Sequence, residues 1–379
     1  MPLKVDVAVI GAGPAGLSVA VEAARHGASV LAIDRNLRPG GQLIKQIHKF
    51  FGSREHRAGV RGIDIARELS DEARAAGVQA WLDSYVYSLF RDGSLEVARG
   101  ELEEAAAGRP AFRETVEPQN IVLCTGASEN AVAFPGWTLP GVMGAGAAQT
   151  MINVERVLPG KRVLMVGSGN VGLIVSYQLV QAGAQVAAVV EAAPQIGGYA
   201  VHAAKVSRAG VPIVTSCTVT KALGSGGVEA AEIAELDAGW SPVAGTERVL
   251  EVDTICIATG LRPSAKLASL AGCEMAYSPL LGGWVPVHGE DMMTSVTGLY
   301  VAGDVAGVEE ASTAMEEGRL AGLSIIERMG LAGASAIAME RKVAGERLSD
   351  LRIGPFGQMR FDAKQALVRR SLARMQGGR

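Results

Sequence analysis

The pattern of apolar and polar positions along the chain occurs twice. In each copy, a continuous apolar run typical of a buried parallel strand leads into a glycine-rich turn, a stretch with helical spacing and a second apolar run. The strands are expected at residues 5–10 and 29–33 in the first copy, and at 162–166 and 185–190 in the second. The pattern therefore predicts two strand, helix, strand units.

The turn after the first strand has the same glycine spacing in both copies. Three glycines at positions one, three and six let the backbone turn tightly and present N–H groups and a helix N-terminus to a pyrophosphate. The residues concerned are Gly11, Gly13, Pro14, Ala15 and Gly16 in the first turn, and Gly167, Gly169, Asn170, Val171 and Gly172 in the second. One such motif is weak evidence, but two on one chain predict two dinucleotide sites.

The repeat continues beyond these units. Residues 77–98 and 210–234 alternate apolar and polar positions between turn glycines, which predicts short antiparallel meanders. Each half then ends in an apolar strand and a Thr-Gly pair, Thr125-Gly126 in the first half and Thr259-Gly260 in the second. The expected fold class is α/β, with two Rossmann-like domains of three layers (ββα).

A further strand ends at Gly303-Asp304 and precedes a helical stretch at 309–329, which does not belong to the second repeat. We expect it to return to the first domain, so that this domain is discontinuous and the second is inserted into it. The expected boundaries are 1–157 and 283–335 for the first domain, 158–282 for the second, and 336–379 for a C-terminal tail.

Acidic and polar residues at the strand ends indicate a flavin in the first domain. Asp34 stands at the end of the second strand, where a carboxylate can accept the hydroxyls of an adenosine ribose. The pair Gly40-Gly41 would let the backbone approach a flat ring, and Gln42 can hydrogen-bond its heteroatoms. Asp304 can bind a ribityl hydroxyl, and the following helix directs its N-terminal dipole at the ring. Taken alone, Asp304 could equally well be a helix cap. Its combination with Asp34 and Gly40-Gly41 favours an FAD site.

The second domain is less regular. Asp34 stands seven residues after Gly27, the glycine that ends the first helix. Seven residues after Gly183, the corresponding glycine, stands Val190, and Glu191 comes one residue later. If Glu191 reaches the ribose, its charge favours NAD(H) over NADP(H). If it does not, the site is vestigial or holds another adenine nucleotide such as ATP.

Composition excludes several classes of protein. The formal charge of −3 gives no reason to expect nucleic acid as a partner. Residues 163–190 carry no formal charge, but their glycines and polar residues fit the nucleotide unit better than a membrane span. No transmembrane segment and no export signal are expected, which predicts a cytoplasmic protein. The four cysteines are far apart and form no Cys-x-x-Cys, so no redox dithiol and no metal site are expected.

Four strings, at residues 134–149, 191–194, 302–307 and 317–322, resemble the thioredoxin reductase and pyridine-nucleotide disulfide oxidoreductase superfamily. They resemble most the branch of FAD-binding subunits of multisubunit opine, octopine, proline or hydroxyproline and sarcosine dehydrogenases and of hydrogen cyanide synthase. The resemblance covers about residues 4–330. It implies FAD, cofactor contacts from Arg35, Ala311 and Ser312, an amino-acid-like substrate and a partner flavoprotein subunit. Many relatives carry a cysteine-rich iron–sulfur region that this sequence lacks, so a small iron–sulfur subunit is expected as a further partner.

Three functions remain open at this point. The first is an FAD-binding electron-transfer subunit of a multisubunit opine, amino-acid or imino-acid dehydrogenase (oxidase). The second is a stand-alone NADH-dependent flavin oxidoreductase, and the third is a nucleotide-binding scaffold subunit without turnover. No strong acid–base group is visible; Lys45, His48 and Lys49 follow the ring-binding glycines and are weak candidates, each more commonly an ordinary solvated side chain.

The tail is basic. From residue 340 to 379 it carries ten Lys or Arg against four Asp or Glu, with one helix expected at 362–375. It is either a solvated basic helix or a docking surface for a partner subunit.

Overall fold

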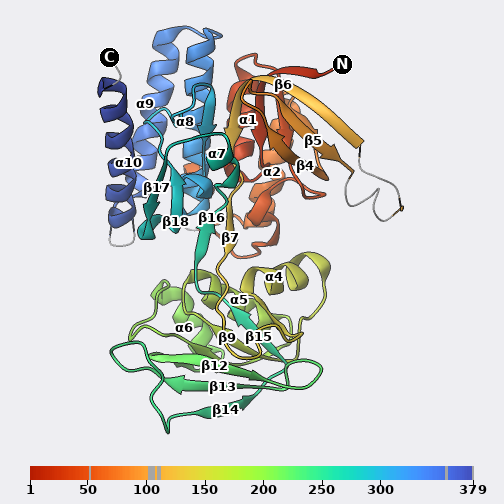
Figure 1. Ribbon diagram of the computed structural model, residues 1–379, viewed down its shortest axis with the longest axis vertical. Coiled ribbons are helices and arrows are strands. Elements are labelled where there is room, and N and C mark those ends of the chain that lie inside the picture. Colours follow the sequence, from red (N-terminus) through yellow and green to blue (C-terminus); the bar gives the residue numbers. More distant parts are fainter. Residues whose placement is uncertain (51–52, 101–106, 109–111, 355–356, 378–379) are drawn as a thin grey trace. The chain divides into compact units, whose positions relative to one another are not determined.

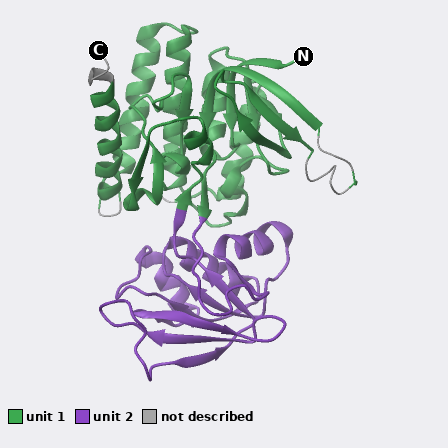
Figure 2. Ribbon diagram, in the orientation of Figure 1, with its two compact units in different colours: residues 1–128, 262–379 green, residues 129–261 purple. Residues whose placement is uncertain are grey.

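The computed structural model describes residues 1–50, 53–100, 107–108, 112–354 and 357–377 (Figure 1). The chain forms two compact units, 1–128 with 262–379 and 129–261 (Figure 2). The first unit is therefore discontinuous, with the second inserted into it. The chain passes between the units at 128/129 and 261/262, earlier than the 157/158 and 282/283 expected from the sequence. The strands that contain these points, β7 (Ala127–Glu129) and β16 (Leu261–Pro263), pair with each other.

The N-terminal part of unit 1 is built around a sheet in the order β3-β2-β1-β6-β5-β4, with β19 also paired to β6. Its strands are β1 (Leu3–Ile10), β2 (Val30–Ile33), β3 (Gln79–Trp81), β4 (Ser84–Leu89), β5 (Leu95–Arg99), β6 (Phe112–Leu123) and β19 (Leu299–Val301). Its helices are α1 (Pro14–Arg25), α2 (Gly62–Ala75) and the short 3-10 turns η1 (Gly41–Lys45) and η2 (Arg54–His56).

Strand β6 carries two different pairings along its length. Its first half pairs antiparallel with β5, and its last residues pair parallel with β19, while β1 runs parallel to it on the other side. The returning segment therefore adds a parallel strand to the sheet of unit 1. As a result the carboxyl ends of β1, β6 and β19 meet at one edge, which is where ligands bind in sheets of this kind.

The C-terminal part of unit 1 contains α7 (Lys266–Leu270), the hairpin β17 (Met275–Ser278) and β18 (Gly283–Pro286), the turns η4 (Pro279–Leu281) and η5 (Asp304–Ala306), and α8 (Ala311–Met329). The tail forms two helices, α9 (Ala334–Leu351) and α10 (Gln358–Gly377), rather than the single helix expected. It is not a simply solvated segment, because Ile337, Ala344 and Leu348 of α9 and Leu367 of α10 are buried in the cores of unit 1.

Unit 2 has the expected three layers. A parallel sheet in the order β11-β10-β9-β15-β8 separates helices from an antiparallel sheet in the order β12-β13-β14. Alternate residues of β9 face opposite ways: Val163 and Met165 pack with the helices, and Leu164 and Val166 with the antiparallel sheet. The strands are β8 (Val142–Gly144), β9 (Arg162–Val166), β10 (Gln185–Val190), β11 (Ile213–Val214), β12 (Cys217–Leu223), β13 (Ala230–Glu235), β14 (Arg248–Glu251) and β15 (Thr254–Ile257). The helices are α4 (Ala145–Thr150), the π turn η3 (Met151–Glu155), α5 (Asn170–Gln181) and α6 (Ala200–Arg208).

The uncharged stretch 163–190 is thus accounted for by β9, α5 and β10. Within the described ranges, no helix has the length and apolar character needed to cross a membrane.

Candidate nucleotide sites

The first glycine turn lies between β1 and α1, and two of its glycines are required by the protein's own packing. Gly11 has φ +105°, and a Cβ there would lie 2.2 Å from the carbonyl oxygen of Cys124. A Cβ on Gly16 would lie 1.8 Å from the carbonyl oxygen of Gly11. These contacts explain why the tight turn and the helix packed on it exclude side chains.

For Gly13, the middle glycine of the turn, the packing of the protein gives no comparable reason to exclude a side chain. Among the described residues, a Cβ there would meet only the Cα of Gly41, at an ordinary 3.8 Å. Gly13 is also the N-cap of α1, where the described residues provide no side-chain cap and no acidic residue in the first turn. An uncapped N-terminus beside a bare backbone is the arrangement that a pyrophosphate requires, so these residues fit the diphosphate of FAD.

The second turn, between β9 and α5, repeats this arrangement. A Cβ on Gly167 would lie 2.3 Å from the carbonyl oxygen of Ala258, and one on Gly172 would lie 2.1 Å from that of Gly167. A Cβ on Gly169 would meet none of the described atoms within 4 Å. The middle glycine is therefore free of internal constraint in both copies, which is the pattern expected of two anion-binding turns.

Asp34 is placed at the first turn as predicted, but it is already engaged there. Its Oδ2 accepts the N–H of Ala12 at 2.7 Å, and its Oδ1 accepts both the backbone and the side-chain N–H of Asn36 at 2.8 Å. A carboxylate has about four lone-pair sites. Asp34 can thus accept one ribose hydroxyl at Oδ2, while a second hydroxyl would have to displace Asn36.

Glu191 occupies the same position in the second turn, despite the extra residue before it. Its Oε2 accepts the N–H of Ser168 at 2.8 Å, as Asp34 accepts that of Ala12, and Oε1 accepts the N–H of Ala193 at 2.9 Å. The register of β10 against β9 shifts between Val186 and Ala188, a β-bulge that absorbs the extra residue. Of the two alternatives for Glu191, the geometry supports the one in which it can reach a ribose.

A pair of glycines in the second unit was not identified from the sequence. Gly197-Gly198 follows Glu191 at the same interval as Gly40-Gly41 follows Asp34. The backbone N–H of Gly40 donates to the carbonyl oxygen of Ala12 at 2.7 Å, and that of Gly198 donates to the carbonyl oxygen of Ser168 at 2.9 Å. Each loop therefore donates one glycine N–H to its nucleotide turn, from the first glycine of the pair in unit 1 and from the second in unit 2. The repeated acid-to-glycine interval was the signal that could have revealed the second pair.

The end of β19 brings Gly303 and Asp304 to the same edge of unit 1. A Cβ on Gly303 would lie 2.9 Å from the Cβ of Ala15 in α1, so the returning segment contacts the first turn directly. Asp304 accepts the N–H of Glu309 at 3.3 Å. Burial raises the pKa of Asp304 to about 6, and nearby Glu317 contributes in the same direction. Ala311 and Ser312, for which the resemblance implies cofactor contacts, form the first turn of α8.

The remaining predicted residues are spread over both units. Thr125 and Gly126 follow β6, where the Thr125 hydroxyl donates to the carbonyl oxygen of Ser264 at 2.9 Å. Gly260 lies three residues after β15 in unit 2, and its carbonyl oxygen accepts the N–H of Asn130. Arg35 and Gln42 are exposed beside the first turn.

The three weak catalytic candidates lie at the end of η1 and in the residues just after it. Lys45 is half-buried at the end of η1, and Lys49 is exposed. The ring of His48 stacks on Phe50, with centroids 5.9 Å apart.

All four cysteines are buried and free. Burial raises the pKa of Cys256 to about 12 and raises that of Cys124 further above its ordinary value. A thiol held neutral in this way is a poor nucleophile. These residues cannot provide the dithiol chemistry of a disulfide reductase.

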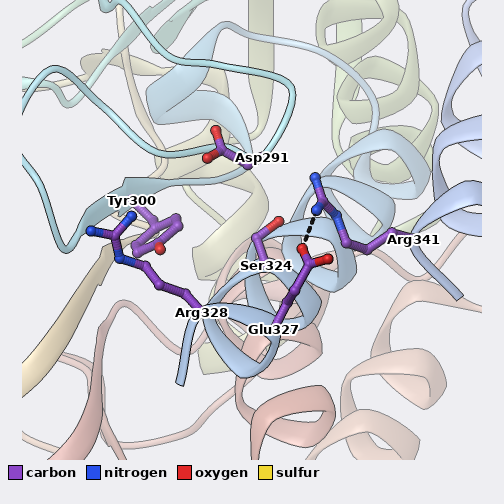
Figure 3. Close-up of a pocket in the computed structure, with 6 residues that line it drawn as sticks. All are labelled: Asp291, Tyr300, Ser324, Glu327, Arg328 and Arg341. Atoms are coloured by element: carbon purple, nitrogen blue, oxygen red, sulfur yellow. Dashed lines mark hydrogen bonds and ion pairs between the residues drawn. The ribbon is translucent and has the colours of Figure 1, made fainter. Parts of the chain in front are cut away.

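Two other polar groups of unit 1 contain none of the predicted residues. A pocket of about 200 Å³ contains an ion pair between Glu327 and Arg341 (Figure 3). The other residues that line it are Asp291, Tyr300, Ser324 and Arg328.

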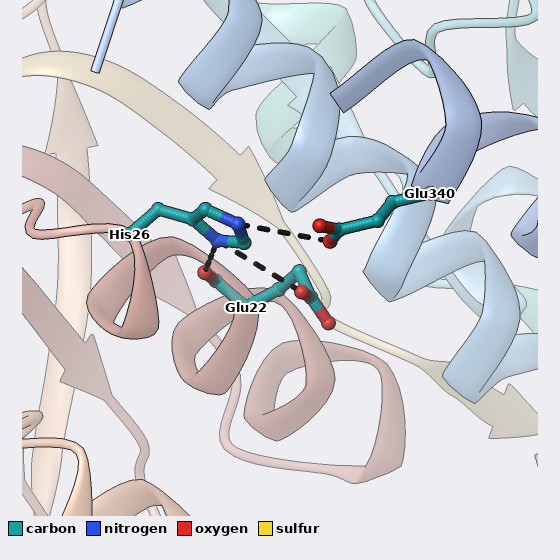
Figure 4. Close-up of side chains that lie close together, drawn as sticks. All are labelled: Glu22, His26 and Glu340. Atoms are coloured by element: carbon teal, nitrogen blue, oxygen red, sulfur yellow. Dashed lines mark hydrogen bonds and ion pairs between the residues drawn. The ribbon is translucent and has the colours of Figure 1, made fainter. Parts of the chain in front are cut away.

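The second group, Glu22, His26 and Glu340, joins α1 to α9 (Figure 4). His26 Nδ1 lies 2.9 Å from the Glu22 carbonyl oxygen, and Nε2 lies 3.6 Å from the carboxylate of Glu340. Although these side chains are close enough to share a metal ion, the ring of His26 is already used to connect the two helices.

Comparison with known proteins identifies the family and related folds. Residues 5–318 match the family described as pyridine nucleotide-disulphide oxidoreductase. The chain is similar to an opine oxidase subunit of Agrobacterium tumefaciens (strain Ach5), with 32% identity over 85% of this chain and 65% of the relative. It is also similar to hydrogen cyanide synthase subunit HcnB of Pseudomonas aeruginosa, with 30% identity over 87% of this chain and 72% of the relative. The chain thus spans about two thirds of the length of these relatives.

Among solved structures, the fold is similar to thioredoxin reductase of T. acidophilum, with a TM-score of 0.69, 21% identity, and 86% of this chain and 99% of that one covered. It is also similar to L-proline dehydrogenase from P. horikoshii, with a TM-score of 0.66, 22% identity, and 90% of this chain and 59% of that one covered. At these identities the likeness concerns the fold.

Proposed function

The chain belongs to the pyridine nucleotide-disulphide oxidoreductase family, a family of FAD-dependent oxidoreductases, and from this premise we propose that it is an FAD-binding electron-transfer subunit. The assembly that it serves is a multisubunit dehydrogenase or oxidase of an amino acid, opine or imino acid. Bound FAD supplies the electron-accepting chemistry. The residues of this chain bind and orient it: the first glycine turn for the diphosphate, Asp34 for the ribose and Asp304 for the ribityl chain.

The observation that carries this proposal is the combination of an intact flavin-type site with four buried, separated cysteines. The nucleotide turns support flavin binding, whereas the cysteines provide no dithiol for the reduction of a disulfide. Electrons must therefore leave the flavin for another centre. The relatives from opine oxidase and hydrogen cyanide synthase are named as single subunits of those enzymes, which supports the presence of partner subunits here. Our proposal names a partner flavoprotein and a small iron–sulfur protein as these subunits.

The test is native purification of the full chain, followed by a visible spectrum and mass spectrometry of the released cofactors and co-purifying proteins. We expect a yellow protein that releases FAD and brings a second flavoprotein and an iron–sulfur protein with it. The same purification from cells that express only the affinity tag identifies background proteins. A colourless chain without FAD contradicts flavin binding, and a yellow chain that purifies alone contradicts the subunit role.

A second candidate function is favoured by the placement of Glu191. Since its carboxylate occupies the position that Asp34 has in unit 1, the second site can accept an adenine ribose without a 2′-phosphate. This supports a stand-alone NADH-dependent flavin oxidoreductase, or an ATP-type nucleotide at a site without hydride transfer. Anaerobic mixing with NADH separates these possibilities: rapid loss of the flavin absorbance by the isolated chain supports the oxidoreductase, and an unchanged spectrum supports the electron-transfer role within an assembly.

A further inference from the structure

The carboxylate of Glu317, on α8, lies at the centre of a buried group of charges behind Gly303. Its Oε2 accepts the backbone N–H of Gly303 at 2.9 Å. Its Oε1 accepts hydrogen bonds from Lys364 Nζ at 2.7 Å and from Arg352 Nη2 at 2.6 Å. The side chains of Glu317 and Lys364 are each only 2% exposed, and that of Arg352 is 7% exposed.

Both cations come from the C-terminal tail and hold the loop 303–310 at three points. Arg352, just after α9, also donates from Nε to the Glu309 carboxylate at 3.0 Å, and the backbone N–H of Glu309 donates to Asp304. Lys364, on α10, packs its stem against Gly307, where a Cβ would lie 3.0 Å from the lysine Cε. The loop that carries Asp304 is thus attached to the tail through Glu309, Gly307 and, by way of Glu317, Gly303.

The charges in this group balance: two carboxylates, Glu309 and Glu317, face two cations, Lys364 and Arg352. Burial alone would raise the pKa of Glu317, but Lys364 and Arg352 lower it to about 2, so it stays ionised and accepts from Gly303. His288, also in this group, has its pKa lowered to about 4 by burial and by Lys364, so it is neutral at neutral pH. Loss of one cation would leave an excess negative charge next to Asp304.

A buried, balanced ion group of this kind is weak evidence for stability, since apolar residues can fill such a space equally well. Its position against the loop 303–310 instead suggests a role in the site. We propose that Lys364 and Arg352 are positioning residues of the flavin site, through which the two C-terminal helices hold the loop 303–310 and keep the Asp304 carboxylate ready to accept from the cofactor. This inference rests on the proposed binding of FAD in unit 1.

The groups that act on Asp304 besides its burial are Glu309, through its backbone N–H, and the charges of Glu317, Lys364 and Glu310. Arg352 and His288 belong to the same group of charges through Glu317. Among them, Lys364 lowers the pKa of Asp304, whereas Glu317 and Glu310 raise it. Removal of the Lys364 charge therefore shifts Asp304 toward its protonated form, which cannot accept as strongly from a hydroxyl. The predicted signature is a change in the pH dependence of FAD binding.

The experiment titrates full-length apoprotein with FAD between pH 5.5 and 8.5 and compares wild type with Lys364→Met, Lys364→Arg and Arg369→Met. Arg369 is an exposed cation on the same helix, so its variant is the matched control for the loss of charge. We expect Lys364→Met to weaken FAD binding about tenfold at pH 7 and to move the pH midpoint of binding upward. Lys364→Arg, which keeps the positive charge, should retain the wild-type FAD affinity and pH midpoint. Arg369→Met should behave as wild type.

The outcomes separate this inference from the proposed function. If wild type binds no FAD, the proposed function fails. If wild type binds FAD and folded Lys364→Met has the same affinity and pH profile, only the positioning role is overturned. Lys364→Gln keeps a donor for Glu317 and replaces the methionine variant if that one does not fold. If neither folds while Arg369→Met does, the ion group serves folding alone and the inference is wrong.

Discussion

At the scale of single residues, the two acids after β2 and β10 show what sequence reasoning can and cannot supply. Asp34 was identified by its interval from Gly11, because a regular strand fixes that interval. Glu191 looked misplaced by one residue, because a β-bulge within β10 leaves no reliable sign in the apolar pattern. Arg352 and Lys364 were missed because their partners lie 35 and 47 residues away in the sequence, and only the packing of the tail brings them together.

The first prediction concerns the division of labour between these acids. Asp34→Ala should weaken FAD binding about 10- to 100-fold, since a hydrogen bond to a charged acceptor contributes roughly 1.5–3 kcal/mol. Glu191→Ala, which removes the equivalent carboxylate from unit 2, should leave FAD binding unchanged. Equilibrium dialysis with FAD measures both variants. Equal loss from both would contradict two independent sites.

The second prediction concerns Asp304 in the protein without flavin. Its pKa, raised from 3.8 to about 6, means that folding disfavours the charged carboxylate. This destabilisation is absent below about pH 4 and complete above about pH 6, and its size is on the order of 1–3 kcal/mol. Asp304→Asn should therefore be more stable than wild type at pH 8 and equal to it at pH 4. Urea unfolding at both pH values checks this; a gain independent of pH would argue against the titration of Asp304.

At the scale of secondary structure, the elements with strong local patterns were predicted correctly. The elements that depend on tertiary packing were not predicted. Strands β9 and β10 have the expected bounds, and α8 (Ala311–Met329) lies within the helical stretch predicted at 309–329. Helix α9 was missed because its apolar residues are mostly small and are only weakly gathered on one face, and because its burial depends on the core of unit 1. Helices α1 and α8 can approach closely because residue 318 is a glycine. A Cβ at this position would lie only 2.3 Å from the carbonyl oxygen of Ala15.

The third prediction separates ligand binding from folding within one turn. Gly13→Ala adds a methyl group where the protein has room, so the variant should fold with near-normal stability and lose FAD affinity at least tenfold. Gly16→Ala adds the same methyl group 1.8 Å from a backbone oxygen, so we expect it to be destabilised by several kcal/mol or not to fold. Thermal unfolding and FAD titration of both variants are the measurements. A Gly13→Ala variant with normal FAD binding would refute the assignment of this turn.

At the scale of the whole molecule, the repeat seen in the sequence becomes two units with the same nucleotide turn, acid and closing loop. The sequence predicted the insertion of one unit into the other, because a strand ending in Gly-Asp had no place in the second repeat. It did not predict where the chain passes between units, since β7 and β16 are short and carry no distinctive pattern. The identity of the substrate and the partners is likewise not encoded in any local motif.

The fourth prediction tests whether the two sites belong to different units. In hydrogen exchange with mass spectrometry, FAD should protect peptides of 1–50 and 299–329, and NAD+ or ATP should protect peptides of 162–200. A ligand at 100 times its dissociation constant stabilises its unit by about 2.7 kcal/mol. Glu191→Ala should lose the second protection and keep the first. Protection of the same peptides by both ligands would contradict separate sites.

The pairing of β19 with β6 also has a consequence for biosynthesis. Residue 123 leaves the ribosome 176 residues before its partner strand begins at residue 299, a delay of about 10–35 s at 5–20 residues per second. During this time the nascent first unit has an unpaired strand edge and lacks both Asp304 and the tail cations, while the inserted unit can already close. The flavin site proposed for unit 1 would therefore be complete only after Asp304 and the tail cations have emerged, and a chaperone that shields the unpaired edge would raise the yield of flavin-bound protein.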